Sequence, residues 1–244
     1  TDSKLFFRFS QAEAIKRKVL VASYWWRKPY EDALKKFATI NNCELVAIGN
    51  LIESGELEVM DGHGSPNSHF VGRGPIPYVK VIEIKNWRVN ENPKYGIPED
   101  LADKMRRGKF LQPWDIVTPT RASKNIGLFG VIMPWQTKLI LTREIAIWRV
   151  TEKKGNRIEP SLLLALMSLQ VVHDQFKFLI LMQMNREDLS DRYKEMLIPI
   201  PKTKELRESW SKHIHDYFTA IATARTSYEK LTQQLDPKLF ADRP

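Results

Sequence analysis

Residues 113–150, PWDIVTPTRASKNIGLFGVIMPWQTKLILTREIAIWRV, decide the class of fold. Three runs in this stretch are rich in β-branched and aromatic residues, and short polar stretches at 123–125 and 136–137 separate them. Such residues favour strands, and polar turn residues between the runs are typical of strands that follow one another directly. The stretch therefore predicts a β-sheet core.

Further strand and loop signals precede this stretch. Residues 76–89, IPYVKVIEIKNWRV, alternate imperfectly between apolar and charged side chains and predict one strand. Residues 61–75, DGHGSPNSHFVGRGP, are rich in Gly, Ser, Asn and Pro and predict a loop. Residues 45–60 predict a short turn followed by a strand. The polar loop is thus expected between two strands.

Helices are predicted on both sides of the strand-rich part. Residues 10–40 contain helix formers, with an interruption at Pro29 and an end near Asn41. A short helix is expected at 98–106 and a longer one from Pro160 to about residue 179. Residues 198–202, IPIPK, are expected to be an extended link, because each proline disfavours helix in the residue before it.

A heptad pattern marks the C-terminal segment. Apolar side chains recur there at alternating spacings of four and three, which are the a and d positions of a coiled coil. These residues are Trp210, Ile214, Tyr217, Ile221, Ala224, Tyr228, Leu231 and Leu235. An amphipathic helix that packs on its own domain gives the same pattern, but the unbroken register favours a partner helix. A homodimer through this helix is one expected arrangement.

Composition limits the classes of protein to consider. The chain has 244 residues, a formal net charge of +9, 43% hydrophobic and 27% charged residues, which is globular composition with a basic balance. A basic balance favours polyanionic partners such as nucleic acid. Cys43 is the single cysteine, so an internal disulfide and a cysteine-based zinc site are excluded, and we expect a cytoplasmic protein. The apolar stretches are too short for a membrane span, and the N-terminus does not resemble a signal peptide.

No catalytic motif stands out. The chain lacks GxxxxGK[ST], GxGxxG, HExxH and GxSxG, and it lacks the tetrapeptide with which DNA methyltransferases hold a base. The histidines have no metal-ligand spacing; they are His63, His69, His173, His213 and His215. One alternative is a Mg²⁺-dependent nuclease that uses Asp61, Glu83 and Lys85, because carboxylates hold Mg²⁺ and a lysine orients water. Solvated side chains on a strand explain the same residues.

Positive charge is concentrated in the second half of the strand-rich part. Residues 121–157 contain eight basic and two acidic residues, a balance of +6. The loop within TPTRASKNIG and the loop at 61–75 carry short polar and basic side chains, which suit contacts to phosphates and base edges. The residues expected to contact DNA are Asn67, Ser68, His69, Arg73, Lys80, Lys85, Arg88, Arg121, Ser123, Lys124 and Asn125. Trp87 is a weaker candidate, because a tryptophan is more often part of the core.

The ordered set of segments resembles a known family. The set comprises a turn at 47–51, the Gly-rich loop, GPIPYVKVIEIKNW at 74–87, LQPWDIVTPTRASKNIGLFGVI at 111–132, QMNREDLSDRYKEMLIPIPK at 183–202, and the heptad helix. It resembles the target-recognition domains of type I restriction-modification specificity subunits, and the equivalent domains attached to some adenine-specific DNA methyltransferases. This chain carries one recognition domain and one helix where complete specificity subunits carry two of each.

The resemblance implies a fold and a role. It implies an α/β fold with a curved mixed β-sheet and flanking helices, divided into a helical lead-in at 1–44, a DNA target-recognition domain at 45–200 and a spacer and docking helix at 201–244. It also implies a non-catalytic module without a cofactor that reads double-stranded DNA. Methyl transfer and base flipping would belong to a partner methyltransferase subunit or domain, with a restriction subunit as a further partner. A protein-interaction adaptor that acts through the helix alone is the remaining alternative.

Overall fold

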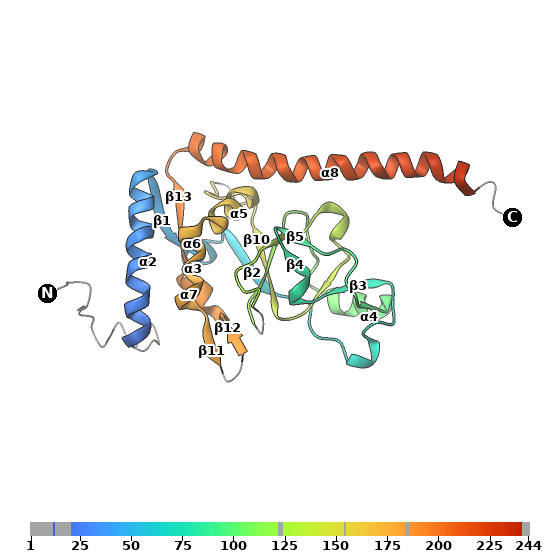
Figure 1. Cartoon of the computed structure of the whole chain (residues 1–244), viewed down its shortest axis with the longest axis horizontal. Coiled ribbons are helices and arrows are strands. Elements are labelled where there is room, and N and C mark those ends of the chain that lie inside the picture. Colours follow the sequence, from blue (N-terminus) through green and yellow to red (C-terminus); the bar gives the residue numbers. More distant parts are fainter. Residues whose placement is uncertain (1–11, 13–20, 122–123, 154, 184–185, 241–244) are drawn as a thin grey trace.

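The computed structural model describes residue 12 and residues 21–121, 124–153, 155–183 and 186–240. It shows a mixed α/β fold with several sheets, flanking helices and a long C-terminal helix (Figure 1), so the predicted class of fold is confirmed. The molecule has two parts. Residues 62–144 form a loop-rich segment between two paired strands, and residues 21–61 and 145–240 form what we call the frame.

An antiparallel pair of strands closes the frame. β1 (Cys43–Ala47) pairs with β13 (Leu197–Pro201), and Cys43 lies opposite Pro201. The segment predicted as an extended link is therefore a strand, and its prolines are accommodated because this sheet has only two strands. α3 (Ile48–Glu53) occupies the position of the predicted turn. The pair places the start of the fold directly beside the entry to the last helix.

α2 (Val21–Ile40) is one continuous helix that contains Pro29, although the sequence predicts an interruption there. Proline removes a helical hydrogen bond and normally kinks or ends a helix. Contacts on both sides of Pro29 hold the helix in place. Arg27 donates a hydrogen bond to Glu195 (2.9 Å) and its guanidinium lies 5.0 Å from the ring centroid of Phe178, while the Tyr30 ring lies 6.1 Å from Phe178. Tertiary packing thus outweighs the local cost of the proline.

A four-stranded antiparallel sheet lies at the centre of the molecule. Its order is β2 (Leu57–Asp61), β10 (Ile145–Val150), β7 (Ile116–Pro119) and β8 (Gly130–Val131). β7, β8 and most of β10 are buried on both faces, which explains their continuous apolar runs. β7 and β8 belong to the 62–144 segment, so this segment completes the sheet to which the frame contributes β2 and β10.

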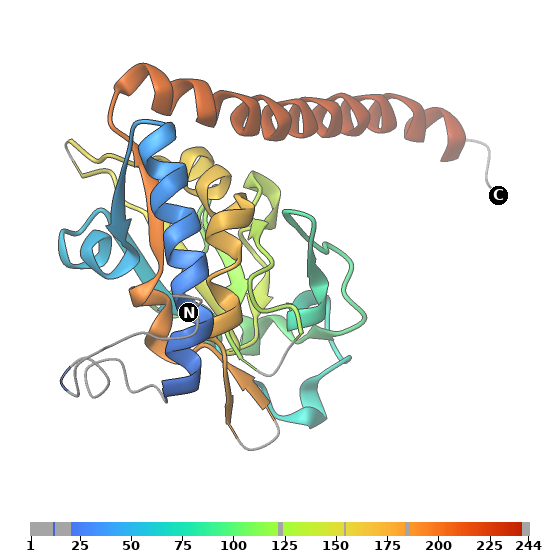
Figure 2. The same cartoon turned by 60° about the vertical axis from the view of Figure 1, so that its left-hand side comes forward.

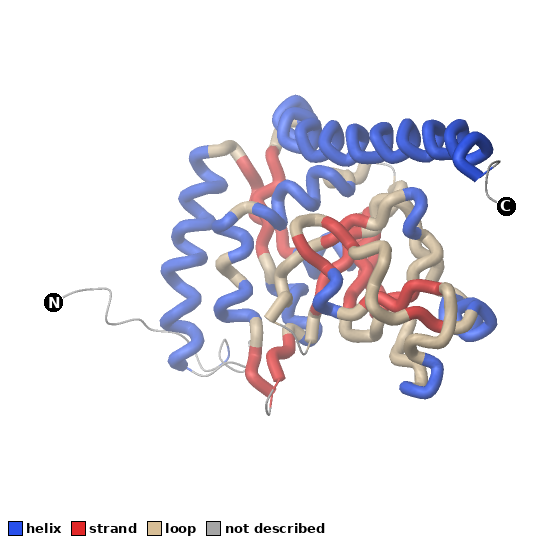
Figure 3. The backbone as a smooth tube through the Cα atoms, turned by 45° about the vertical axis from the view of Figure 1, so that its right-hand side comes forward, coloured by secondary structure: helices blue, strands red, loops and turns tan. Residues whose placement is uncertain are grey.

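Short strands and turns make up the 62–144 segment (Figure 3). β3 (Ile76–Val79) pairs with β6 (Gly96–Ile97) and, in parallel, with β9 (Ile140–Leu141); α4 (Glu99–Arg106) follows β6. The prediction of a single strand at 76–89 is wrong. This stretch is divided into β3, the 3-10 helix η3 (Val81–Glu83), β4 (Ile84–Lys85) and β5 (Arg88–Val89). Asn86 and Trp87 form the turn between β4 and β5 with φ angles of 49° and 63°.

Three short helices replace the single helix predicted at 160–179. They are α5 (Pro160–Ser168), α6 (Gln170–His173) and α7 (Phe176–Leu179), and the extended ψ of 131° at Leu169 separates the first two. α5 is buried on nearly every side, since Leu162, Leu163, Leu164, Leu166 and Met167 are all inaccessible to solvent. β11 (Leu181–Gln183) and β12 (Arg186–Asp188) form a hairpin on the side of the molecule away from the C-terminal helix (Figure 1).

The C-terminal helix α8 (Lys204–Phe240) crosses the molecule and extends past it (Figures 1 and 2). Phe218 on α8 is 1% exposed and belongs to the main hydrophobic core, which also includes Leu34, Trp148 and Leu163. Within the part of the chain that the structure describes, no single helix has the length and apolar character to cross a bilayer; Pro160–Ser168 and Gln170–Leu179 pass that test only as a pair bent by 73°.

Candidate nucleic-acid interface

The two parts of the molecule differ in charge. The 62–144 segment contains thirteen Lys and Arg and seven Asp and Glu, a balance of +6, whereas the frame contains nineteen of each. Most of the net charge of +9 therefore lies between β2 and β10. Nine of these thirteen cations are exposed, whereas Arg106 is buried, so most of this charge is presented to solvent. Such a surface attracts polyanions.

The basic cluster that the sequence shows at 121–157 does not form one surface. Arg149 makes two hydrogen bonds to Asp115, at 2.8 and 2.7 Å, and these raise the pKa of Arg149 above its usual value. Arg157 donates a hydrogen bond to Glu56 at 2.9 Å. Burial alone would raise the pKa of Glu56, but the hydrogen bonds from Arg157 have the larger combined effect and hold the pKa below its usual value. These two arginines stabilise the fold, and the charge that remains for a partner lies elsewhere.

The loop at 62–75 brings together four of the predicted residues. Asn67 accepts a hydrogen bond from the backbone N–H of His69 (2.9 Å), and the His69 ring lies 3.2 Å from the guanidinium of Arg73. All three side chains, and that of Ser68, are exposed. The loop begins at Gly62, where a Cβ atom would lie 2.2 Å from a carbonyl oxygen of Thr142. Gly62 also donates its backbone N–H to the carbonyl of Ile145 (2.7 Å), so the start of the loop is fixed against the frame while its polar groups remain accessible.

The loop at 120–128 is held more closely. Arg121 lies 4.0 Å from Asp188 on the adjacent hairpin, and Asn125 donates a hydrogen bond from its amide to the carbonyl of Val81 (3.2 Å). Lys124 is exposed between them, and Ser123 lies outside the described residues. Lys124 is therefore the predicted residue of this loop whose charge is best placed for a partner.

The remaining predicted contacts lie near the hairpin of β4 and β5. Lys85 and Arg88 face each other across it and are exposed, and the Lys80 ammonium lies 4.1 Å from the ring centroid of Tyr95. Trp87 is half-buried: its indole N–H donates to Ser168 (3.0 Å) and its ring lies 6.0 Å from that of Tyr217. Trp87 thus joins the hairpin to α5 and α8.

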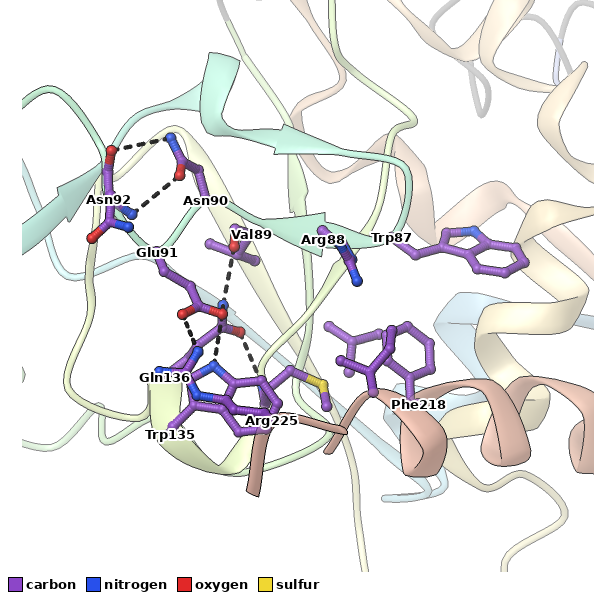
Figure 4. Close-up of a pocket in the computed structure, with 13 residues that line it drawn as sticks. Trp87, Arg88, Val89, Asn90, Glu91, Asn92, Trp135, Gln136, Phe218 and Arg225 are labelled. Carbon is purple, nitrogen blue, oxygen red and sulfur yellow. Dashed lines mark hydrogen bonds and ion pairs between the residues drawn. The ribbon is translucent and has the colours of Figure 1, made fainter. Parts of the chain in front are cut away.

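A polar cluster anchors the chain after this hairpin to α8 (Figure 4). The carboxylate of Glu91 accepts a hydrogen bond from the indole of Trp135 (2.7 Å) and pairs with Arg225 of α8, whose guanidinium lies 4.5 Å from the centroid of the Trp135 ring. A cavity of about 410 Å³ lies beside the cluster, with Phe218 among its lining residues. The 62–144 segment is therefore connected to the long helix by specific charged contacts.

His63 has a structural role. One ring nitrogen accepts the N–H of Leu141 (3.0 Å), so the other donates to the carbonyl of Lys109 (2.8 Å). Burial is the main cause that lowers the pKa of His63 to about 4, with smaller contributions from Arg106 and Lys109. Both ring nitrogens are occupied by backbone groups. Over the part of the chain that the structure describes, no group of three or more His, Cys, Asp or Glu side chains could hold a metal ion.

The residues of the nuclease alternative lie in different surroundings. Asp61 ends β2 and lines a cleft of about 250 Å³ together with Thr120, Arg121 and Tyr193. Glu83 accepts a hydrogen bond from Asn90, beside the β4–β5 hairpin. The cleft lies between the start of the 62–75 loop and the start of the 120–128 loop.

One exposed basic turn lies outside the predicted contacts. Residues 107–110, RGKF, follow α4; Arg107 is exposed, Gly108 has a φ of 76°, and the Phe110 side chain is 65% exposed. The turn lies next to the start of the 62–75 loop, because His63 bonds to Lys109. The doubled arginine before the glycine is the sequence signal for this turn, but the same residues also mark the end of a helix.

The heptad residues of α8 fall into two groups. The first group packs on this chain's own domain: Trp210 lies 6.2 Å from Phe37, and Ile214 and Ile221 contact the main core. Tyr217 is 42% exposed, and its ring lies 6.0 Å from that of Trp87. The second group, Ala224, Tyr228, Leu231 and Leu235, is exposed. The first half of α8 therefore packs on its own domain, and a partner helix for the exposed second half stays a prediction.

Comparisons with known proteins find similar structures but no similar sequences. No protein-family model and no curated protein matches this chain. A solved chain from a type I R-M system, studied for complex assembly and conformational transition, is 16% identical with a TM-score of 0.46, covering 92% of this chain and 55% of its own length. The type I restriction-modification S subunit from M. genitalium is 13% identical with a TM-score of 0.48, covering 82% of this chain and 47% of its own.

A third solved structure gives a similar result. The HsdS subunit from Thermoanaerobacter tengcongensis is 15% identical with a TM-score of 0.44, covering 93% of this chain and 54% of its own length. The chain thus spans about half the length of the solved proteins that it matches.

Proposed function

We propose that this chain binds double-stranded DNA in a sequence-selective way and performs no chemistry itself. The observation that carries the proposal is the separation of charge, since the 62–144 segment has a balance of +6 and the frame has none. Arg73, Lys85 and Lys124 are exposed on turns of that segment. Cations fixed on turns above a rigid sheet contact phosphates, and the polar side chains beside them reach base edges.

The wider role is that of a specificity module in a restriction-modification system. The ordered sequence resemblance supports this role, in which the module directs an adenine methyltransferase, and in some systems an endonuclease, to its target. Flipping and methylation of the base take place in that partner. No cofactor is needed for recognition alone, and the protein is expected to work in the cytoplasm.

The exposed half of α8 supports a second activity, which is to dock a protein partner. Tyr228, Leu231 and Leu235 are between 42% and 69% exposed on a helix that extends past its own domain. A row of such side chains at heptad spacing suits another helix, from a methyltransferase or from a second copy of this chain. Leu231→Asp is expected to abolish this docking and to leave DNA affinity unchanged.

The test of DNA recognition is a binding titration. The protein first selects duplexes from a random pool, and the dissociation constants for a selected and a scrambled duplex of equal length are then measured at two salt concentrations. We expect tighter binding to the selected duplex and a decrease of affinity with salt, with a slope of about −0.9 per phosphate contact. Equal affinity for both duplexes at both salt concentrations would refute sequence recognition.

A further inference from the structure

The ring of Phe110 is exposed although its residue type is normally buried. Phenylalanine is among the residues most often found inside proteins, because removing its ring from water stabilises a fold. Phe110 is nevertheless 65% exposed, while its neighbour Leu111 is 4% exposed within a core cluster. The chain therefore places one apolar side chain inside the fold and presents the preceding one to solvent.

The turn that carries Phe110 is held firmly from two sides. His63 donates to the carbonyl of Lys109 (2.8 Å), and Arg149 donates to the carbonyl of Phe110 (2.7 Å). Arg149 is itself fixed by Asp115, which is 2% exposed, and the Lys109 ammonium donates to the carbonyl of Asp61 (3.2 Å). An exposed ring on a backbone held in this way needs little further ordering when it binds, which favours affinity.

The surroundings of Phe110 are those of the proposed DNA-binding surface. Arg107 is exposed three residues before it, and the turn adjoins the start of the 62–75 loop. Three other large apolar side chains of the 62–144 segment are also exposed, and each lies within four residues of an exposed cation in sequence. They are Phe70 near Arg73, Ile82 near Lys85 and Leu128 near Lys124.

We propose that Phe110 contacts the bases of the bound duplex, with its ring pressed against a base step while Arg107 contacts the flanking phosphate. The inference rests on the proposed function and adds a specific base-contacting residue to it. A neutral ring gains little from phosphates, whereas it packs against base faces and can separate stacked bases. Of the four exposed apolar residues, Phe110 has the most exposed side chain and lies on the turn that His63 and Arg149 hold in place.

Substitutions at Phe110 test the proposal. The variants are Phe110→Ala, Phe110→Trp and a control, Ile40→Ala, whose parent side chain is 71% exposed at the end of α2 in the frame. The probes are a duplex selected by the wild-type protein and the same duplex with one mismatched base pair at a position where the selected pool shows no base preference. We expect Phe110→Ala to weaken binding at least about tenfold with an unchanged salt slope, and Phe110→Trp and Ile40→Ala to stay within about threefold of wild type.

The mismatched duplex gives an independent readout. A mismatch lowers the cost of unstacking, so the wild type is expected to bind it more tightly than its matched parent, and Phe110→Ala is expected to lose that preference. If Phe110→Ala binds the selected duplex within about twofold of wild type, the proposed role of the ring is overturned. The same holds if Phe110→Trp weakens binding as much as Phe110→Ala does. Either result leaves the proposal of DNA recognition intact. A wild-type protein that binds no duplex would overturn both proposals. Equal thermal midpoints of the variants confirm that each is folded.

Discussion

The 62–144 segment and the frame share one hydrophobic core but not one charge balance. Ile116, Phe129 and Val131 of the segment belong to the same buried cluster as Leu34 and Trp148 of the frame. The segment nevertheless has an excess of six positive charges, whereas the charges of the frame cancel. Apolar packing therefore joins the two parts, whereas their charge balances differ and indicate that the segment is the part that contacts a polyanion. Net charge read over the whole chain indicates a partner, but its distribution along the chain indicates where that partner binds.

Some cations of the charged regions hold the fold, and the largest predicted effect concerns one of them. Asp115 is buried and accepts hydrogen bonds from Arg149 and from the backbone N–H of Gln112 (2.7 Å). Asp115→Ala leaves the guanidinium of Arg149 without its carboxylate partner, so we expect the free energy of unfolding to fall by about 3–5 kcal/mol in urea titrations. Asp188→Ala removes the looser contact to Arg121 and is expected to cost less than about 1 kcal/mol. Similar losses in both variants would contradict the distinction.

His63 makes the stability of the segment dependent on pH. Its pKa is about 4 in the folded chain and about 6.5 when unfolded, so protonation favours unfolding. This contribution is fully present above pH 6.5 and is lost as the pH falls toward 4. Relative to its value at neutral pH, the free energy of unfolding falls by about 2 kcal/mol at about pH 5 and by about 3 kcal/mol at about pH 4 through this group. Urea titrations from about pH 7.5 to 4 are expected to show a shallower decline for His63→Gln, and parallel curves would exclude this role.

The position of charge, rather than its amount, is tested by two triple variants. One replaces Arg73, Lys85 and Lys124 of the segment with alanine, and the other replaces the exposed frame lysines at 28, 204 and 212. Both variants remove three positive charges. We expect the first variant to weaken duplex binding by about 2 kcal/mol. The slope of log affinity against log salt concentration should decrease by the amount that corresponds to about three phosphate contacts. The second should bind within about twofold of wild type, and equal losses would show that net charge alone matters.

The sequence predicts the frame better than the segment. The helix α8 is recovered because burial of one face requires its periodic pattern, and β10 is recovered because burial on both faces requires a continuous apolar run. The hairpin at 84–89 is missed because positive φ at Asn86 and Trp87 has no glycine to mark it. The break at Leu169 is missed because the residues around it are apolar on all sides, so periodicity gives no signal there.

The candidate interface is predicted in composition but not in arrangement. Asn67, His69 and Arg73 come together on one loop because they are close in sequence. The partners of Arg149 and Arg157 lie 34 and 101 residues away, so no local pattern marks these arginines as structural. Phe110 looks like an ordinary core residue in the sequence, and only its exposure in the fold distinguishes it.

The smallest predicted effect lies at the junction between the two parts. Arg225 of α8 pairs with Glu91 of the segment and its side chain is 35% exposed, so solvent screening limits the contribution of the pair. Arg225→Ala removes the ion pair and the contact with the Trp135 ring, and we expect a loss of about 1 kcal/mol together with a change in Trp135 fluorescence. Lys212→Ala removes an exposed pair within α8 itself and serves as the control.

Amide exchange in the last turns of α8 separates the two variants. Faster exchange is expected for Arg225→Ala and not for Lys212→Ala, because Arg225 joins α8 to the segment directly before the exposed stretch 226–231 of the helix. Equal exchange in both variants would mean that packing around Phe218 alone sets the position of the helix.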